Sequence, residues 1–196
     1  MVLYRLLRAL FRGFFRIFYR WQVSGTENIP AEGGIIVCAN HISNLDPPVV
    51  GSGMERPMAF MAKDSLFKIP VIGSIIRGVG AFPVKRGSGD RGAIRASLEL
   101  LAAGKALCLF PEGTRSHSGE VGKGQGGAAM LALRSNAQVV PAAIIGPYRL
   151  FRPLRIVYGK PVDLSEFRGQ KTNSELIDKA TEQIMEAIRQ LVLQHR

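Results

Sequence analysis

The chain has 196 residues, 46% of them hydrophobic, which is enough for one domain with a sizeable core and excludes disorder as the default state. Its 26 Lys and Arg against 15 Asp and Glu leave a formal charge of +11, so the surface should attract an anionic partner. Nucleic acid, a membrane and phosphorylated small molecules all satisfy this charge, and composition does not choose among them.

Residues 1–21, "MVLYRLLRALFRGFFRIFYRW", are expected to form one helix with two unlike faces. No apolar run in them reaches the roughly 18 to 20 residues that spanning a bilayer needs, and no short apolar region precedes a small-residue cleavage site. At about 100° per residue, five arginines fall within an arc of roughly 120°, and leucines and aromatic residues fill the opposite half. These arginines are Arg5, Arg8, Arg12, Arg16 and Arg20.

This amphipathic pattern predicts a helix that lies in a membrane interface with its basic face toward lipid phosphates. Packing of the helix on its own domain remains the alternative. We therefore divide the chain into a membrane-docking helix, residues 1–21, and one globular domain, residues 22–196.

Past Pro30, short apolar runs alternate with helix-like segments. Strands are expected in "GGIIVCAN", "MAFMAK", "GVGAFPVKR", "KALCLFPEG", "AQVVPAAIIG" and "LRIVYGKPV", and helices in "GAIRASLELLAAG" and "GGAAMLALRSN". Gly104 should end the first of these helices. Continuous apolar strands separated by helices predict an α/β domain with a mostly parallel or mixed central sheet, covered by helices on both faces.

The last segment is expected to be an ordinary packing helix. Thr172 and Glu175 fit a capping box at its start. One apolar stripe follows, formed by Leu176, Ile177, Ala180, Ile184, Ile188 and Leu191.

Cys38 and Cys108 each lie in an apolar run, which predicts two buried, reduced thiols in a cytoplasmic protein. The three histidines and these two cysteines lack the spacing of a structural zinc site, so we expect no metal.

Ligands of α/β sheets bind at the carboxyl ends of the strands, so the segments that follow the strands matter most. Three expected strands lead into polar or charged groups: "NHISNLD" at 40–46, "PVKRGSGDR" at 83–91 and "PEGTRSHSG" at 111–119. We expect these three segments to form one site.

The spacing of His41 and Asp46 has two interpretations. Asp46 precedes Pro47 and fits a helix N-cap with proline at the first helical position, which leaves His41 as a loop residue. In the other interpretation His41 is a general base and Asp46 holds its tautomer. Since no G-x-S-x-G elbow occurs, a base here implies that a substrate hydroxyl is the attacking group.

The other two segments suit phosphate. Lys85 and Arg86 lie among glycines, and Gly113, Thr114 and Arg115 follow Pro111, offering backbone N–H groups, a hydroxyl and a guanidinium. Neither segment has the order of a Walker loop.

Four segments in order resemble the 1-acylglycerol-3-phosphate acyltransferase family, over roughly residues 20 to 165. "NHISNLD" matches the Asn-His-x4-Asp motif of that family and "FPEGTRS" matches its third motif, while "GAFPVKR" and "VVPAAI" resemble its second and fourth. The resemblance implies transfer of a fatty acyl group from a thioester of coenzyme A or acyl carrier protein to the free hydroxyl of a lysophosphatidate.

The resemblance also implies roles for individual residues. His41 would be the base and Asp46 its orienting carboxylate. Phosphate binding would fall to Lys85, Arg86, Gly113, Thr114 and Arg115, with Glu112 positioning the acceptor or these cations, and Pro141 shaping the wall near the acyl group. The acyl thioester is a co-substrate, and no further cofactor is expected.

These expectations describe a monotopic acyltransferase at the cytoplasmic face of the cell membrane, bound to anionic lipid and not to nucleic acid. Glycerol 3-phosphate or another lysolipid remains an alternative acceptor. A non-catalytic lipid-binding membrane protein is the alternative from a different class, and an RNA-binding module, without a recognisable motif, is the third.

Overall fold

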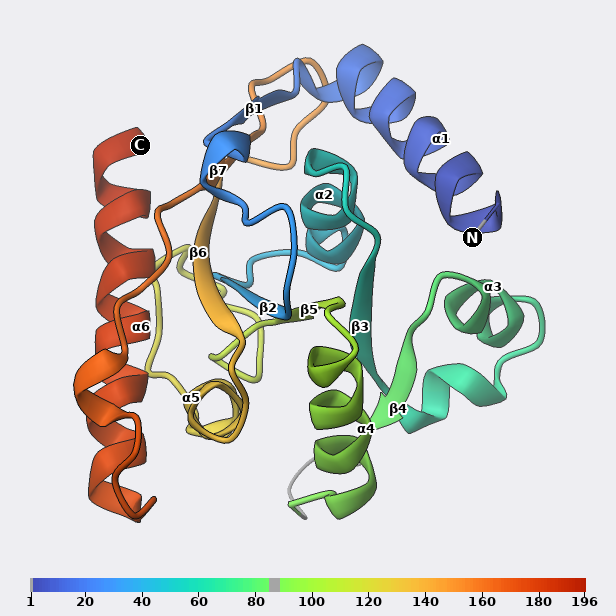
Figure 1. Ribbon diagram of the computed structural model, residues 1–196. Helices are drawn as coiled ribbons and strands as arrows, with labels where there is room; N and C mark the ends of the chain where they lie inside the picture. Colours follow the sequence, from blue (N-terminus) through green and yellow to red (C-terminus); the bar gives the residue numbers. More distant parts are fainter. Residues whose placement is uncertain (1, 85–88) are drawn as a thin grey trace.

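A seven-stranded sheet forms the centre of the computed structural model, which describes residues 2–84 and 89–196 (Figure 1). The strand order is β1-β7-β6-β2-β5-β3-β4. Neighbouring strands are parallel except β6 and β7, which are antiparallel. The strands are β1 (Gln22–Ser24), β2 (Ile35–Ala39), β3 (Met58–Lys63), β4 (Phe82–Val84), β5 (Ala106–Leu109), β6 (Gln138–Ile145) and β7 (Arg155–Tyr158). The predicted α/β domain with a mostly parallel or mixed sheet is confirmed.

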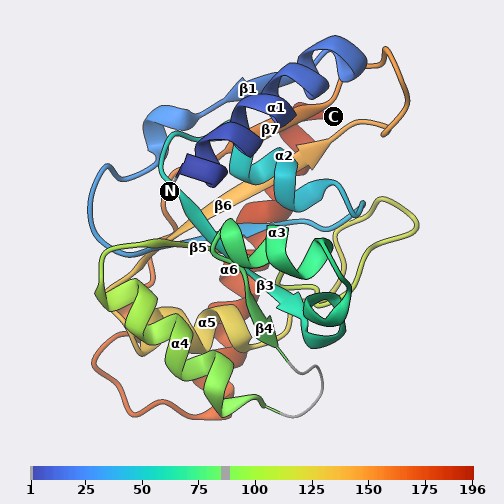
Figure 2. The same cartoon turned by 90° about the vertical axis from the view of Figure 1, so that its right-hand side faces the viewer.

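Helices cover both faces of this sheet, because its central strands are apolar on both sides. One core lies between the sheet and α4 (Arg91–Ala102), α5 (Gly127–Leu133) and α6 (Ser174–His195). The other lies under α1 (Val2–Tyr19) and α2 (Asp46–Gly53). The helix α3 (Ile72–Gly78) lies on the same side of the molecule as α1, as Figure 2 shows. Short 3-10 helices occur at η1 (Thr26–Asn28), η2 (Asp64–Lys68) and η3 (Ser165–Phe167).

Two local predictions need correction. The capping box is wrong, because the carboxamide of Asn173, not Thr172, accepts the N–H of Leu176 at 2.8 Å. The strand expected in residues 78–86 is shorter in the structure, where β4 covers Phe82–Val84. Gly78, the first residue of the expected strand, is the last residue of α3. Gly104 does end α4 as predicted: its φ of 70° is in the left-handed region, which glycine adopts without strain.

The N-terminal helix packs on the domain along one edge. Tyr4, Phe15 and Tyr19 are buried against α2 and the sheet, and α1 has no acidic residue in its first turn. No helix in the described ranges is long and apolar enough to cross a membrane.

Two of the five arginines in residues 1–21 face the protein, which corrects the prediction that all five face lipid. Arg12 Nε donates to the carbonyl of Ser52 at 2.7 Å, and both Arg8 and Arg12 form ion pairs with Glu55. Arg5, Arg16 and Arg20 are exposed. The cause is that α1 rests on the C-terminal end of α2, where backbone carbonyls lack helical partners.

Strands β2, β5 and β6 are parallel neighbours, so their carboxyl ends meet at one edge of the sheet. The buried side chain of Asn40 fixes this edge, because it binds both backbone groups of Ile144: its Oδ1 accepts the N–H at 2.7 Å and its Nδ2 donates to the carbonyl at 3.0 Å. The residues after each of these strands therefore begin from fixed positions.

Candidate active site

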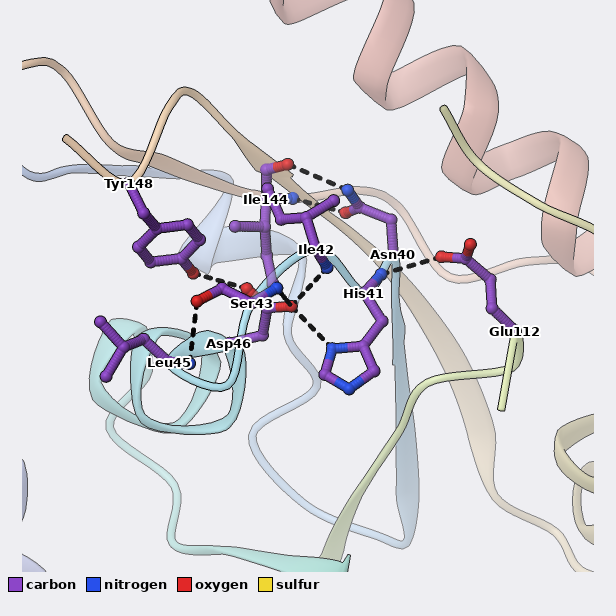
Figure 3. Close-up of polar contacts among 9 residues, drawn as sticks. All are labelled: Asn40, His41, Ile42, Ser43, Leu45, Asp46, Glu112, Ile144 and Tyr148. Carbon is purple, nitrogen blue, oxygen red and sulfur yellow. Dashed lines mark hydrogen bonds and ion pairs between the residues drawn. The ribbon is translucent and has the colours of Figure 1, made fainter. Parts of the chain in front are cut away.

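Asp46 is the buried centre of the site, with 0% of its surface exposed. Its Oδ2 accepts the backbone N–H groups of Ile42 at 2.6 Å and Ser43 at 2.7 Å, and lies 2.7 Å from Nδ1 of His41 (Figure 3). These donors precede Asp46 in the chain, and the carboxylate makes no hydrogen bond that caps α2. The interpretation of Asp46 as a helix N-cap is therefore wrong, although proline does occupy the first turn.

The contact with Asp46 determines the tautomer of His41. An ionised carboxylate only accepts hydrogen bonds, so Nδ1 must carry the proton and Nε2 of the neutral ring keeps its lone pair. The imidazole also stacks on Phe110, with ring centroids 4.2 Å apart and an interplanar angle of 22°. Its side chain keeps 14% of its surface exposed. Asp46 and Phe110 hold the ring of His41 in place, and Nε2 keeps a basic lone pair. This arrangement suits a general base.

Tyr148 is a further member of the site that the sequence analysis missed. It follows β6, and its hydroxyl donates to Oδ1 of Asp46 at 2.5 Å. Burial, and then the charge of Asp46, raise the pKa of Tyr148 above its ordinary value, so the hydroxyl keeps its proton and remains a donor. The strand-end rule applied to "AQVVPAAIIG" would have found it, because Tyr148 is the first polar side chain after that strand.

Glu112 is buried and binds backbone groups. Its Oε1 accepts the N–H of His41 at 2.8 Å, and its Oε2 accepts that of Gly122 at 2.9 Å. In addition, the N–H of Ser116 donates to the carbonyl of His41 at 2.7 Å. The segments 40–46 and 111–119 are therefore joined, as the sequence analysis expected, with Glu112 holding the loop to the catalytic candidate.

The three residues after Glu112 begin the exposed part of this loop. Gly113 has a φ of 70°, in the left-handed region that glycine adopts without strain. Thr114 and Arg115 are exposed beyond it. The loop thus presents a hydroxyl and a guanidinium close in sequence to the residues that hold His41.

The sequence predicts three further residues near this site. Lys85 and Arg86 lie outside the described residues. Pro141 lies in β6 next to Gly159, where a Cβ on the glycine would be 3.0 Å from its Cγ. That position faces α6, whereas Asp46 lies on the α2 side, so the expected role of Pro141 in the acyl wall gains no support.

Across residues 2–84 and 89–196, no three or more His, Cys, Asp and Glu side chains are grouped to hold a metal ion. Cys38 and Cys108 are both buried and free, on neighbouring strands.

Comparison with known proteins gives a consistent result. A family model described as Acyltransferase matches residues 20–145. The chain is 30% identical over 176 residues to the 1-acyl-sn-glycerol-3-phosphate acyltransferase of Bacillus subtilis, covering 87% of each protein. It is 30% identical over 132 residues to the protein of the same name from Borreliella burgdorferi, covering 66% of this chain and 52% of that one.

A solved structure agrees over nearly the whole chain. The 1-acyl-sn-glycerophosphate (LPA) acyltransferase of Thermotoga maritima superposes with a TM-score of 0.75 at 29% identity, covering 98% of this chain and 80% of that one. The likeness therefore includes the sheet and the strand-end loops that carry His41 and Asp46.

Proposed function

The chain belongs to the Acyltransferase family and is an O-acyltransferase, and we propose that it transfers a fatty acyl group from a thioester to the 2-hydroxyl of 1-acylglycerol 3-phosphate. The observation that carries the proposal is the contact between His41 and Asp46, which leaves Nε2 as a base at the carboxyl edge of the sheet. The names of the relatives at 30% identity support the choice of acceptor. The donor is a fatty acyl thioester of coenzyme A or of acyl carrier protein.

In the proposed reaction the hydroxyl oxygen of the acceptor attacks the thioester carbonyl carbon while Nε2 of His41 takes the hydroxyl proton. The carbon–sulfur bond then breaks, and the leaving thiolate receives that proton from Nε2. The products are phosphatidate and a thiol, and His41 returns to its starting state. Asp46 stabilises the intermediate imidazolium and holds the ring in place. General-base help of this kind contributes roughly 10²–10⁴ in rate.

The acceptor phosphate is assigned to the loop after Glu112. Gly113 forms a half-buried turn, and the exposed Thr114 and Arg115 offer a hydroxyl and a forked guanidinium, which binds phosphate through two parallel hydrogen bonds. Lys85 and Arg86 remain proposed as additional cations for this phosphate.

The acceptor is a membrane lipid, so we place the enzyme on an anionic membrane surface at the cytoplasmic face, with α1 as a docking helix. The outward side of α1 carries exposed Leu3, Leu6, Leu10 and Ile17, with Arg5, Arg16 and Arg20 along one edge of them. This order of apolar surface and adjoining cations suits a helix at the headgroup boundary.

The test uses purified protein, labelled acyl-coenzyme A or acyl carrier protein, and lysophosphatidate, glycerol 3-phosphate and a lysolipid without a terminal phosphate as acceptors. We expect labelled phosphatidate as the main product. The variant His41→Ala should lose at least about 100-fold in turnover while it folds and binds vesicles as the parent does. His117→Ala, at an exposed histidine of the same loop region, is the matched control.

Two results contradict the proposal in different ways. Retention of more than about a tenth of the turnover by His41→Ala would remove the base assignment, because general-base catalysis is worth far more. A faster reaction with glycerol 3-phosphate would keep the chemistry and change the acceptor.

A further inference from the structure

The segment 66–75, between β3 and β4, exposes an unusual amount of apolar surface. Among the described residues, every exposed large apolar side chain except Leu193 lies on α1, on this segment, or at Leu150 and Phe151. The segment contributes five in ten residues: Leu66, Ile69, Val71, Ile72 and Ile75. A patch of this density marks a surface with a partner.

Contacts at both ends of α1 make these apolar regions continuous. At its start, Leu3 packs against α3 so closely that a Cβ on Gly78 would lie 2.4 Å from Leu3 Cδ2. At its end, the rings of Phe18 and Phe151 are 6.4 Å apart, and the N–H of Phe151 donates to the carbonyl of Phe18 at 2.6 Å. Figure 2 shows α1 and α3 on the same side of the molecule.

The tip of the segment, residues 70–72, points outward and has a strained backbone. Pro70, Val71 and Ile72 form a γ-turn in which the N–H of Ile72 donates to the carbonyl of Pro70 at 2.7 Å. Val71 at its centre has a φ of 66°, a strained conformation for a β-branched residue. Val71 is nevertheless 71% exposed, so packing against the described residues offsets little of this strain.

Neighbouring contacts keep this turn in place. Phe67 is buried below it, Arg77 Nη2 donates to the carbonyl of Phe67 at 3.1 Å, and the guanidinium of Arg77 lies 5.6 Å from its ring centre. A Cβ on Gly73 would lie 2.4 Å from the same carbonyl. The tip is therefore a defined structure that presents Val71 and Ile72 to the outside.

Basic residues surround the continuous apolar surface. Lys63 is exposed next to the segment and Lys68 is exposed within it, and Arg149 and Arg152 are exposed on either side of Leu150 and Phe151. Two acidic groups near this surface are paired, Asp64 with Lys68 at 3.0 Å and Glu55 with Arg8 and Arg12. Apolar side chains with a cationic border complement an anionic bilayer better than they complement a second copy of a chain with a charge of +11.

We propose that the segment 66–75 is a second membrane-contacting element, which inserts Val71 and Ile72 into the headgroup boundary of an anionic bilayer beside α1. This inference rests on the membrane location in the proposed function. A single interfacial helix leaves the domain free to roll about the helix axis. A second contact removes that freedom and fixes the height of the His41 edge above the lipid.

The test compares vesicle binding of Val71→Gly/Ile72→Gln with that of Leu193→Gln. Glycine accepts the positive φ, so the first variant removes apolar surface and relieves strain. Leu193 is 64% exposed on α6, at the other side of the molecule, and serves as the matched control. With vesicles of phosphatidylcholine and phosphatidylglycerol, we expect the double variant to lose about tenfold in partition coefficient, equivalent to about 1.4 kcal/mol. Its melting temperature and its activity on a soluble short-chain acceptor should not fall.

Insertion is measured directly with a tryptophan probe. In a Trp21→Phe background, which removes a buried indole N–H without a partner in the described structure, Ile72→Trp should be quenched by brominated lipids and Leu193→Trp should not. Vesicle binding and quenching need no turnover, so a failure of the proposed reaction leaves this test intact.

Three results would overturn the proposal: an unchanged partition coefficient for the double variant, no quenching of Ile72→Trp, or equal losses for Leu193→Gln. If sedimentation velocity in lipid-free buffer showed a dimer that Val71→Gly/Ile72→Gln dissociates, the surface would belong to a second copy and not to a membrane.

Discussion

The carboxylate of Asp46 accepts four hydrogen bonds at a position with no exposed surface, and each donor constrains a different part of the site. The N–H groups of Ile42 and Ser43 fold the loop after β2 around the carboxylate, while Tyr148 ties it to the end of β6. A buried charge without such partners would be strongly destabilising. The arrangement therefore serves the fold and positions His41 at the same time.

Tyr148 is a positioning residue, since it acts on His41 through Asp46. Tyr148→Phe leaves Oδ1 of Asp46 without its donor, so the carboxylate holds the imidazole less firmly. We expect kcat to fall roughly tenfold, a loss of about 1.4 kcal/mol, with the acceptor KM unchanged. Steady-state kinetics on a soluble acceptor provide the measurement.

Tyr19→Phe is the control for this variant, because the ring of Tyr19 lies 6.1 Å from that of Tyr148 and its hydroxyl is not one of the four donors to Asp46. A purely structural role of the Tyr148 hydroxyl would instead lower the melting temperature and leave kcat per folded molecule unchanged.

Arg115 is exposed, so its replacement tests phosphate binding with little effect on folding. Arg115→Ala should raise the KM for lysophosphatidate about tenfold to a hundredfold, since hydrogen bonds to charged groups contribute about 1.5–3 kcal/mol. The KM for the acyl donor should change little. Arg115→Lys should restore only part of the loss, because a lysine cannot form two parallel hydrogen bonds to phosphate.

Arg134→Ala, at an exposed arginine beyond α5, is the matched control. If an acceptor without phosphate suffers the same rise in KM, Arg115 does not bind that phosphate.

At the scale of elements, the helix α1 combines two functions that the sequence analysis treated as alternatives. It is packed on α2 through Tyr4, Phe15 and Tyr19, and it exposes leucines on the other side. The arginines divide in the same way, because Arg8 and Arg12 have only 16% and 27% of their side chains exposed whereas Arg16 and Arg20 are exposed.

This division predicts that one pair of substitutions weakens vesicle binding and that another pair lowers the melting temperature. Arg16→Gln/Arg20→Gln should weaken binding to anionic vesicles by about tenfold or more at low salt, since each basic residue near the surface adds about 1 kcal/mol, with no change in melting temperature. Arg8→Gln/Arg12→Gln should lower the melting temperature, because the carbonyl of Ser52 and the carboxylate of Glu55 lose their partners.

Vesicle sedimentation and thermal unfolding of the two variants test which arginines contact lipid and which stabilise the fold. Equal losses of vesicle binding in both, with equal melting temperatures, would mean that the helix leaves α2 when it meets lipid.

For the whole molecule, burial determines how stability responds to alkaline pH. Burial raises the pKa of Cys38 to about 12, and it also raises the pKa values of Cys108 and Tyr158 well above their ordinary ranges. These groups stay protonated in the folded state and ionise in the unfolded state near pH 9 to 10. Their contribution to stability is therefore complete below the unfolded pKa and is lost as pH rises toward the folded pKa.

We expect the free energy of unfolding to fall between pH 9 and pH 12 by about 1.4 kcal/mol per pH unit for each such group. Urea denaturation at several pH values provides the measurement. In Cys38→Ala/Cys108→Ala, two of the groups are gone, so the stability should fall less steeply with pH. The same slope in the variant and the parent would show that the thiols are not responsible.

The order of residues along the chain is enough to predict the features that depend on local patterns. Apolar runs of strand length predicted β2, β5, β6 and β7, because a strand buried on both faces must be apolar at successive positions. Helical patterns predicted α1, α4, α5 and α6, and for α6 also most of the face that it buries. The motif around His41 and Asp46 indicated the family. The helix α3 was missed, because its short sequence IGSIIRG contains two glycines, which are weak helix formers.

The contacts of these residues depend on how the elements pack in three dimensions. Whether Asp46 caps a helix or holds a histidine depends on the fold of the loop after β2, which five residues of spacing do not specify. Tyr148 meets Asp46 across 102 positions of the chain because β2 and β6 are parallel neighbours, and strand order is set by how the whole sheet packs. The arginines of α1 were equivalent in the sequence until the end of α2 supplied partners for two of them, since a helix places its side chains but its neighbours determine their environment.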